Sequence, residues 1–313
     1  MKSQMTPSSS NNRATTALGA VEGGYEPIAS SRDRKASLSK TLRSARSGAL
    51  FGFLSIAAII TFVPFAYMLS SSFKRRDEIY SVPVTWIPSE IEPLNYVRLF
   101  EEIPFAREYL NSAVIAVIVV ASVLFFSSLA GFAFAKYQFR FKNQMFLFVL
   151  ATMMIPIQVQ VVPLYLIVNS LGWLNTYQGV FVPQAMSAFG IFLMRQMMLS
   201  VPDEILDAAR VDGASEVGLF RHVAIPMTRA GLLVLALLTA LTSWNDYLWP
   251  VIVLRSEDML TVPLGLAALI NTYRVEYGMV LAGSTLAMLP VVALFIVFNR
   301  HFVAGLTSGA VKF

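Results

Sequence analysis

The stretch YLNSAVIAVIVVASVLFFSSLAGFAFA, residues 109–135, carries no charged side chain. A helix needs about 20 mostly apolar residues to cross a bilayer core about 30 Å thick, so this stretch is long enough to span a membrane. Other apolar runs long enough to span a membrane lie at 47–73, 143–194, 231–254 and 277–299. The longest run is interrupted by the polar, glycine-containing NSLGWLNT at 169–176, which divides it into two spans. The sequence therefore predicts an all-α integral membrane protein with six transmembrane helices.

The composition of the chain agrees with a membrane protein. Hydrophobic residues make up 56% of the sequence and charged residues only 14%, against about 25% charged in soluble domains. The absence of cysteine and the presence of only two histidines exclude disulfides, thiolate metal sites and a histidine-built zinc centre. The sequence also lacks a phosphate-binding loop, an H-E-x-x-H zinc motif and a G-x-S-x-G nucleophile elbow. We therefore expect no enzyme active site and no cofactor on this chain.

The distribution of lysine and arginine predicts the orientation of the six spans. Six spans place both termini on one side, which holds fifteen basic residues between Arg32 and Lys312, whereas the opposite side holds seven. Because basic residues are retained in the cytoplasm, we expect both termini to be cytoplasmic. Lys74, Arg75 and Arg76 go against this rule. The net charge of +5 is then mainly a topology signal, and we expect no binding to nucleic acid.

Segments outside the spans divide the chain into regions. Residues 1–46 are rich in serine and threonine and predict a disordered cytoplasmic tail ahead of the first transmembrane helix, 47–73. The outer loop, 74–108, contains four prolines that disfavour a long helix, although a short one near Leu94 to Phe100 is possible. The remaining five helices form the region 109–300, which is followed by a cytoplasmic C-terminal tail, 301–313.

The cytoplasmic segment 200–228, between spans four and five, reads as two short helices. Asp203 and Glu204 suit the positive end of a helix dipole, and the first helix is expected to end near Asp212. Gly213 breaks it, Ser215 caps the second helix, and Pro226 is expected to end that helix. An anionic membrane surface would repel this acidic segment, so a protein partner explains it better than an interfacial helix pair does.

The same segment resembles a known family signature. Asp207-Ala208-Ala209, then Gly213 after three residues, and VAIP at 223–226 after nine more, is similar to the E-A-A, G and I-x-L-P pattern of ABC importer permease subunits. Asp207, Val223 and Ile225 depart conservatively from that pattern. Further strings extend the resemblance to the carbohydrate (MalG-like) branch of binding-protein-dependent sugar transporters: PLNYVRLF at 93–100, LNSAVIA at 110–116, AGFAFAKYQF at 130–139, SWNDYLWP at 243–250 and GLTSGAVKF at 305–313.

This resemblance implies a type I ABC importer permease fold and a set of partners. The segment 200–228 would be the coupling-helix pair that meets a cytoplasmic ATPase, through Asp207, Ala208, Ala209, Arg210 and Gly213. The chain would form half of a translocation path with a second permease subunit, and two ATPase copies would hydrolyse ATP. The loop from about Leu254 to Gly278 would reach toward an extracytoplasmic sugar-binding protein. The expected location is the cytoplasmic (inner) membrane of a prokaryote.

Asp246 is the charged residue that lies well inside a predicted span. It belongs to a group, Trp244, Asn245, Asp246 and Tyr247, that is a candidate for the translocation path or for binding-protein contact. An aromatic belt at the outer interface explains the same residues equally well. An alternative function is a proton-coupled secondary transporter using Asp246. An intramembrane enzyme is disfavoured by the missing motifs.

Overall fold

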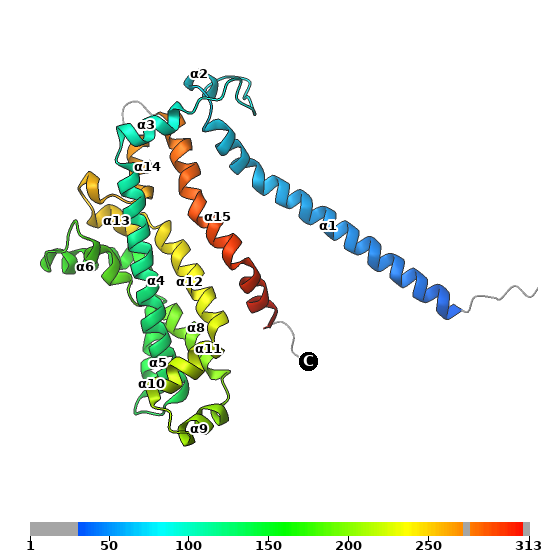
Figure 1. Ribbon diagram of the computed structural model, residues 1–313, viewed down its shortest axis with the longest axis vertical. Helices are drawn as coiled ribbons and strands as arrows, with labels where there is room; N and C mark the ends of the chain where they lie inside the picture. The colour runs from blue at the N-terminus through cyan, green and yellow to red at the C-terminus, as the bar shows by residue number, and fades with distance from the viewer. Residues whose placement is uncertain (1–30, 272–275, 309–313) are drawn as a thin grey trace, which may run out of the picture. The chain divides into compact units, whose positions relative to one another are not determined.

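The computed structural model describes residues 31–271 and 276–308, with the side chains of 46–270 and 276–298. Every regular element in these residues is a helix, which confirms the predicted all-α class (Figure 1). Two compact units, Met1–Thr61 and Phe62–Phe313, are described separately below.

The described part of the smaller unit consists of the first part of α1 (Ser31–Ser71). α1 begins at Ser31 and so overlaps the predicted disordered tail, because the sequence has no glycine or proline between Ser31 and Gly48. The remainder of that predicted tail, 1–30, lies outside the described residues. Leucine, isoleucine and phenylalanine side chains of α1 are exposed along its apolar part, 46–71, as expected of a helix that meets lipid or another membrane helix.

Apolar helices of different lengths make up the candidate membrane spans. α1, α4 (Phe105–Lys136) and α15 (Tyr277–Ser308) are each long and apolar enough to cross a membrane. Two further candidates are bent pairs: α5 (Lys142–Thr152) with α6 (Ile157–Ser170), at 99°, and the helix 216–227 with α12 (Arg229–Trp244), at 78°. α8 (Ala188–Leu199) is apolar but shorter. The described helices thus give three spans, or up to five, and the number six stays a prediction.

The sharpest of these bends, 99°, lies between α5 and α6, within the third predicted span. α5 ends at Thr152, and Pro156 precedes α6 in an extended conformation with φ −59° and ψ 139°. Proline disfavours a helical conformation in the residue before it and has no backbone N–H to donate, so the helix stops rather than kinks here. Pro163, in contrast, lies inside α6.

α4 forms the centre of the larger unit, where it packs against α8 and α12. Gly131 of α4 lies so close to α8 that a Cβ there would come within 2.7 Å of the Met194 Cβ and 2.8 Å of the Arg195 backbone nitrogen. Gly190 of α8 makes a comparable close approach to Ser127 of α4. Small residues allow membrane helices to pack closely, and these two positions bring α4 and α8 together.

Shorter elements lie at the two ends of α4 (Figure 1). One end carries α2 (Arg76–Ile79), α3 (Leu94–Glu102), η3 (Glu257–Met259) and α14 (Val262–Asn271). α3 confirms the short helix expected in the loop 74–108. The other end carries α9 (Asp203–Val211), α10 (Glu216–Gly218), η2 (Leu219–Ala224) and α11 (Ile225–Met227). The remaining elements are α7 (Tyr177–Phe181), η1 (Val182–Gln184) and α13 (Leu248–Val253).

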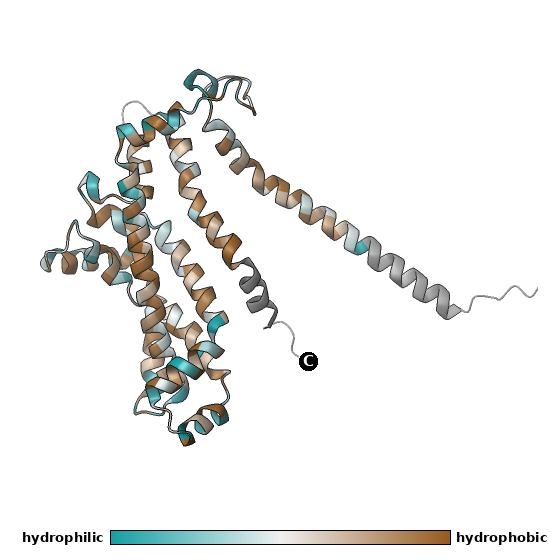
Figure 2. Ribbon diagram, in the orientation of Figure 1, coloured by the Kyte–Doolittle hydropathy of each residue, from teal (hydrophilic) through white to brown (hydrophobic). Residues whose placement is uncertain are grey.

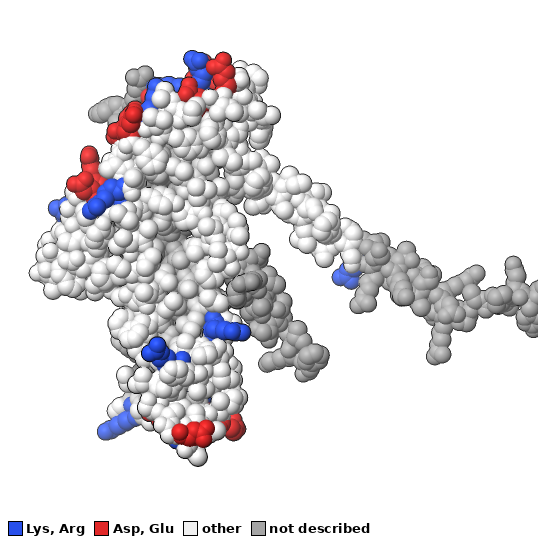
Figure 3. Space-filling model, viewed as in Figure 1, with Lys and Arg blue, Asp and Glu red and all other residues white. Residues whose placement is uncertain are grey.

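Charges gather toward these ends. Figure 2 shows α4, α12 and α15 as largely hydrophobic between the ends, and Figure 3 shows lysine, arginine, aspartate and glutamate toward the α2–α3 end and the α9–α10 end of the visible face, with a broad uncharged surface between them. Such an uncharged band between two charged ends is the pattern of a protein that spans a bilayer.

Lys74, which goes against the predicted charge rule, has a local structural explanation. Its side chain is fully buried, its Nζ donates to Ser71 Oγ at 3.0 Å and to the Thr85 carbonyl oxygen, and it lies 4.6 Å from the centre of the Tyr67 ring. Arg76 pairs with Glu276 at 2.6 Å. These two basic side chains are therefore held in place by specific partners within the protein.

Candidate functional site

The predicted coupling segment begins with an amphipathic helix. α9 starts directly after Pro202, which is extended, and carries Asp203 and Glu204 in its first turn, where the helix dipole favours negative charge. Leu206 on one side of α9 is buried in the hydrophobic core. Val211 on the last turn is 88% exposed. One side of α9 is therefore anchored, and its last turn is free for a partner.

Gly213 ends α9 in a Schellman motif. The Gly213 N–H donates to the Arg210 carbonyl at 3.0 Å, and the Ala214 N–H donates to the Ala209 carbonyl at 2.9 Å. These two bonds require a left-handed residue at position 213, whose φ is +85°. Glycine adopts this conformation without the steric cost that a Cβ brings. The expected break at Gly213 is confirmed, and it has a conformational cause.

The second helix follows Ser215, which caps it as expected by accepting from the Gly218 N–H at 3.2 Å. The helix then widens into the π-helical turn η2 ahead of Pro226, which cannot donate a backbone hydrogen bond. The prediction that Pro226 ends this helix is wrong, because the helix continues to Met227 and the chain turns at Thr228, with φ −101° and ψ 12°.

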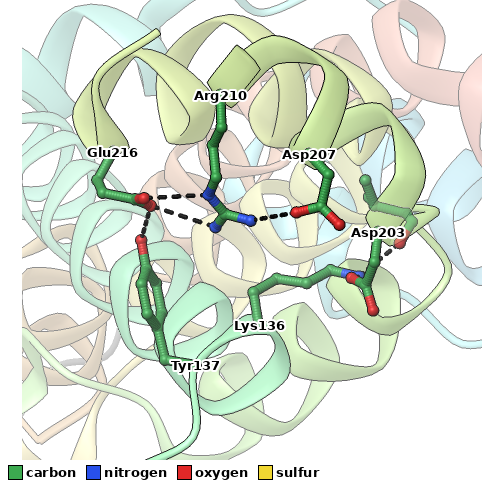
Figure 4. Close-up of polar contacts among 7 residues, drawn as sticks. Lys136, Tyr137, Asp203, Asp207, Arg210 and Glu216 are labelled. Atoms are coloured by element: carbon green, nitrogen blue, oxygen red, sulfur yellow. Dashed lines mark hydrogen bonds and ion pairs between the residues drawn. The ribbon is translucent and has the colours of Figure 1, made fainter. Parts of the chain in front are cut away.

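A polar network ties this segment to the end of α4 (Figure 4). Arg210 donates from Nε to Glu216 Oε1 at 3.1 Å and from Nη1 to Asp207 Oδ1 at 2.7 Å. The Tyr137 hydroxyl, directly after α4, also donates to Glu216. Arg210 thus bridges α9 and α10 across the turn, and Tyr137 connects α10 to α4.

Lys136, the last residue of α4, holds the start of α9. Its Nζ donates to Asp203 Oδ1 at 2.7 Å and to the Val201 carbonyl oxygen (Figure 4). The hydrogen bond and the positive charge of Lys136 lower the pKa of the Asp203 carboxyl. The coupling segment is therefore joined to two consecutive residues at the end of α4: Lys136 bonds at the start of α9, and Tyr137 bonds at the start of α10.

The five predicted coupling residues lie together but differ in what they expose. Asp207, Ala208, Arg210 and Gly213 are exposed, whereas Ala209 is half-buried and packs against the hydrophobic core. The carboxylate of Asp207 and the guanidinium of Arg210 bond to each other. Ala208 and Gly213 are thus open to a partner, while Ala209 contributes to packing within the chain.

Several residues of this site were missed in the sequence. Lys136, Tyr137 and Glu216 form the network, and Val217 is 73% exposed beside it. Lys136 and Tyr137 lie in the string AGFAFAKYQF, which carried part of the family resemblance but no assigned role. The exposure of Val211 and Val217 becomes visible only once the turn at Gly213 is in place.

The second predicted group lies at a break between helices. The prediction of a continuous helix through Asp246 is wrong: α12 ends at Trp244, and α13 begins at Leu248. Pro250 lies in the first turn of α13, where its missing N–H removes no helical hydrogen bond, so the sequence favours a new helix there. Asp246 therefore lies in a short non-helical link.

Each member of the group 244–247 has a different environment. Trp244 is buried and donates from Nε1 to the Ala287 carbonyl at 3.0 Å. Asp246 Oδ2 accepts from Gln184 Nε2 at 2.9 Å. Tyr247 is 44% exposed, and Asn245 is exposed with its amide bonded to the Leu241 carbonyl at 2.8 Å.

Trp244 also lines two recesses. One, of 650 Å³, is apolar and lies between α4, α12 and α15. The other, of 380 Å³, includes Asn245, Pro263 and Ser284 and is partly polar. The structure thus brings Trp244 and Asn245 to one cavity, which keeps them as candidate path residues, while Asp246 bonds toward η1.

Comparisons with known proteins identify the family. Residues 124–308, more than half of the chain, match the family described as "Binding-protein-dependent transport system inner membrane component". The arabinooligosaccharides transport system permease protein AraQ of Halalkalibacterium halodurans is 40% identical over 264 residues, covering 83% of this chain and 94% of that protein. The lactose transport system permease protein LacG of Rhizobium radiobacter is 33% identical, covering 84% of this chain and 95% of that protein. The sn-glycerol-3-phosphate transport system permease protein UgpE of Escherichia coli O6:K15:H31 is 31% identical, covering 80% and 92%.

Solved structures share the fold. A chain of a bacterial ABC transporter involved in alginate import matches with a TM-score of 0.74 and 24% identity, covering 88% of this chain and 99% of that chain. A chain of a bacterial alginate ABC transporter in complex with a pentasaccharide-bound periplasmic protein matches with a TM-score of 0.59 and 14% identity, covering 83% and 97%. On the family match and the identities of its relatives, the chain belongs to the family of binding-protein-dependent transport system inner membrane components.

Proposed function

We propose that this chain is a permease subunit of an ATP-driven carbohydrate importer, located in the inner membrane of a prokaryote with both termini in the cytoplasm. It pairs with a second permease subunit to form the translocation path, and two ATPase copies and an extracytoplasmic binding protein complete the importer. Relatives named for arabinooligosaccharides and lactose support a carbohydrate substrate, and the relative named for sn-glycerol-3-phosphate extends the class to polyol phosphates.

The observation that carries the coupling proposal is the exposed apolar surface of the coupling segment. Val211 and Val217 are 88% and 73% exposed, although the segment lies outside the uncharged band and its polar side chains are bonded to one another. Removing a valine side chain from water is favourable. At this charged, water-facing end, a partner protein is needed to cover the two valines. A groove of a cytoplasmic ATPase is the partner that the family membership supports.

Co-purification tests this contact. We expect Val211→Asp to reduce the ATPase retained by the purified permease at least tenfold, because the new charge would be buried in the contact without a partner. Val84→Asp is the matched control, since Val84 is 57% exposed at the opposite end of the unit, and it should retain the ATPase. Normal retention with Val211→Asp would remove the proposed docking surface.

Uptake assays test the substrate class. Cells that express the complete system should take up lactose, arabinotriose or sn-glycerol 3-phosphate, and uptake should require ATP and persist when a protonophore collapses the proton gradient. The alternative, a proton-coupled transporter using Asp246, predicts loss of uptake with the protonophore and with Asp246→Asn. Uptake that survives ATP depletion would contradict the importer proposal.

A further inference from the structure

α4 is hydrogen-bonded at both of its ends to segments that are remote in the sequence. At the Phe105 end, Asn111 is fully buried and donates from Nδ2 to the carbonyl oxygens of Asp258 and Leu260, each at 2.8 Å. The Ser112 hydroxyl, also buried, accepts from the Val262 N–H at 2.9 Å. In each of these three bonds the partner is a backbone atom of the stretch 258–262, so α4 fixes the position of that stretch of backbone.

Close packing adds to this attachment. The Glu108 side chain of α4 is buried against Gly265 of α14, where a methyl group would overlap its carboxylate. Leu99 and Phe105 pack with Val262 in a separate hydrophobic cluster. The stretch from 258 to Gly265 therefore moves with the Phe105 end of α4. This stretch belongs to the loop 254–278, which is expected to reach the binding protein.

The Lys136 end of α4 holds the coupling segment in a comparable way. Lys136 bonds to Asp203, and Tyr137 bonds to Glu216, so consecutive residues reach the start of α9 and the start of α10. A single helix is thus bonded at one end to the loop proposed to meet the binding protein and at the other to the segment proposed to meet the ATPase.

α4 is also an unbroken route between these ends. Its 32 residues contain no proline and span about 48 Å at a rise of about 1.5 Å per residue. The two bent pairs turn by 99° and 78°, and α15, although continuous, contains Pro290. A continuous helix transmits an axial shift or a tilt from one end to the other with little internal loss, which broken helices do not.

We propose that α4 is a coupling rod, in which Asn111 and Ser112 at one end and Lys136 and Tyr137 at the other are positioning residues that transmit the state of the loop 254–278 to the coupling segment. This inference rests on the proposed function, because it assigns the two ends of α4 to the binding protein and the ATPase. None of the four residues contacts the transported molecule in this mechanism. They carry the signal that a loaded binding protein has docked.

The test measures how strongly the loaded binding protein stimulates ATP hydrolysis by the complete complex in proteoliposomes, with whichever of the three uptake substrates is transported. Ser112→Ala removes the bond to the Val262 N–H, and Tyr137→Phe removes the bond to Glu216. Each single substitution should lower the stimulation ratio about two- to tenfold, the range of one net hydrogen bond, when complexes of equal ATPase content are compared.

A matched control exists within the chain. Ser128→Ala makes the same change in the same helix, but the buried Ser128 hydroxyl donates only to Leu124 of α4 itself. This control should leave the stimulation ratio unchanged.

The double variant Ser112→Ala/Tyr137→Phe separates a rod from two independent structural defects. If both bonds act along one route, the stimulation ratio of the double variant should be no lower than that of the worse single variant. If the two substitutions cause independent defects, their fold losses of stimulation should multiply. Effects on unfolding temperature should add, because the two sites lie about 38 Å apart. Multiplying losses of stimulation, or unchanged stimulation in the single variants, would overturn the rod. If the unaltered complex contains no ATPase or shows no stimulation, it is the proposed function that fails.

Discussion

Lys136 and Asp203 form an ion pair of 2.7 Å in which one side chain is buried and the other is exposed. The exposed fraction is 5% for Lys136 and 76% for Asp203. The lysine stem is covered by protein. Its ammonium group donates hydrogen bonds to the exposed Asp203 carboxylate and to the Val201 carbonyl oxygen. Asp203 therefore fixes the start of α9 at the end of α4, although the bond is open to water on one side.

Acid should weaken this attachment in a defined pH range. Because Lys136 lowers the pKa of Asp203, the pair stabilises the folded protein above the ordinary aspartate pKa of about 3.9, and this contribution is lost as pH falls through the lowered value. We expect the difference in unfolding temperature between the unaltered protein and Asp203→Asn to be constant from about pH 7 to about pH 5 and to shrink below about pH 4. A difference that does not change with pH would show that the carboxylate charge is not its source.

The loss of stability caused by substitutions at Gly213 should depend on backbone conformation and not on side-chain size. No described atom lies within 4 Å of the position of a Cβ at Gly213, so space is open, but φ is +85°. Asparagine tolerates the left-handed region better than alanine does, and alanine costs about 1 kcal/mol or more. Unfolding temperature should fall in the order Gly213, Gly213→Asn, Gly213→Ala. If steric obstruction of a partner dominates instead, ATPase retention will be lower for Gly213→Asn than for Gly213→Ala.

Local features of this segment were predictable from sequence, whereas its attachment was not. The break at Gly213 and the cap at Ser215 each depend on residues within five positions of each other, which a short motif specifies. Lys136 and Asp203 are 67 residues apart, and only the packing of α4 against α8 brings them together. The long-range bonds of Asn111 to Asp258 escaped prediction for the same reason.

Breaks within apolar segments were a second feature that the sequence did not predict. Hydrophobicity marks 143–194 and 231–254 as membrane-embedded, but it does not distinguish a straight helix from two helices at an angle. Pro156 lies inside the third predicted span, and the structure places a 99° bend there. Pro250 was a comparable signal in the fifth span, since it fits the first turn of a new helix better than the interior of a long one.

Gly131→Ala should destabilise the contact between α4 and α8. The added methyl group would lie 2.8 Å from the backbone nitrogen of Arg195, so a helix must move to accommodate it. Overpacking of this kind costs about 1 to 3 kcal/mol, and we expect a lower unfolding temperature and a lower yield in detergent. Gly52→Ala is the control, because no described atom lies within 4 Å of its Cβ position and alanine favours the helix. Equal stability of the two variants would argue against close packing at Gly131.

The absence of cysteine from the chain allows a direct test of topology. Val211 and Val84 are well exposed at the α9 end and in the loop between α2 and α3, and the proposed orientation places them in the cytoplasm and outside the cell membrane. In right-side-out vesicles, a membrane-impermeant maleimide should label Val84→Cys and not Val211→Cys, and in inside-out vesicles the pattern should reverse. The unaltered protein, lacking thiols, should stay unlabelled in both. Labelling of both positions from one side would mean that they lie on the same side of the membrane, which contradicts the proposed topology. A reversed pattern would place the coupling segment outside, where no cytoplasmic ATPase could reach it.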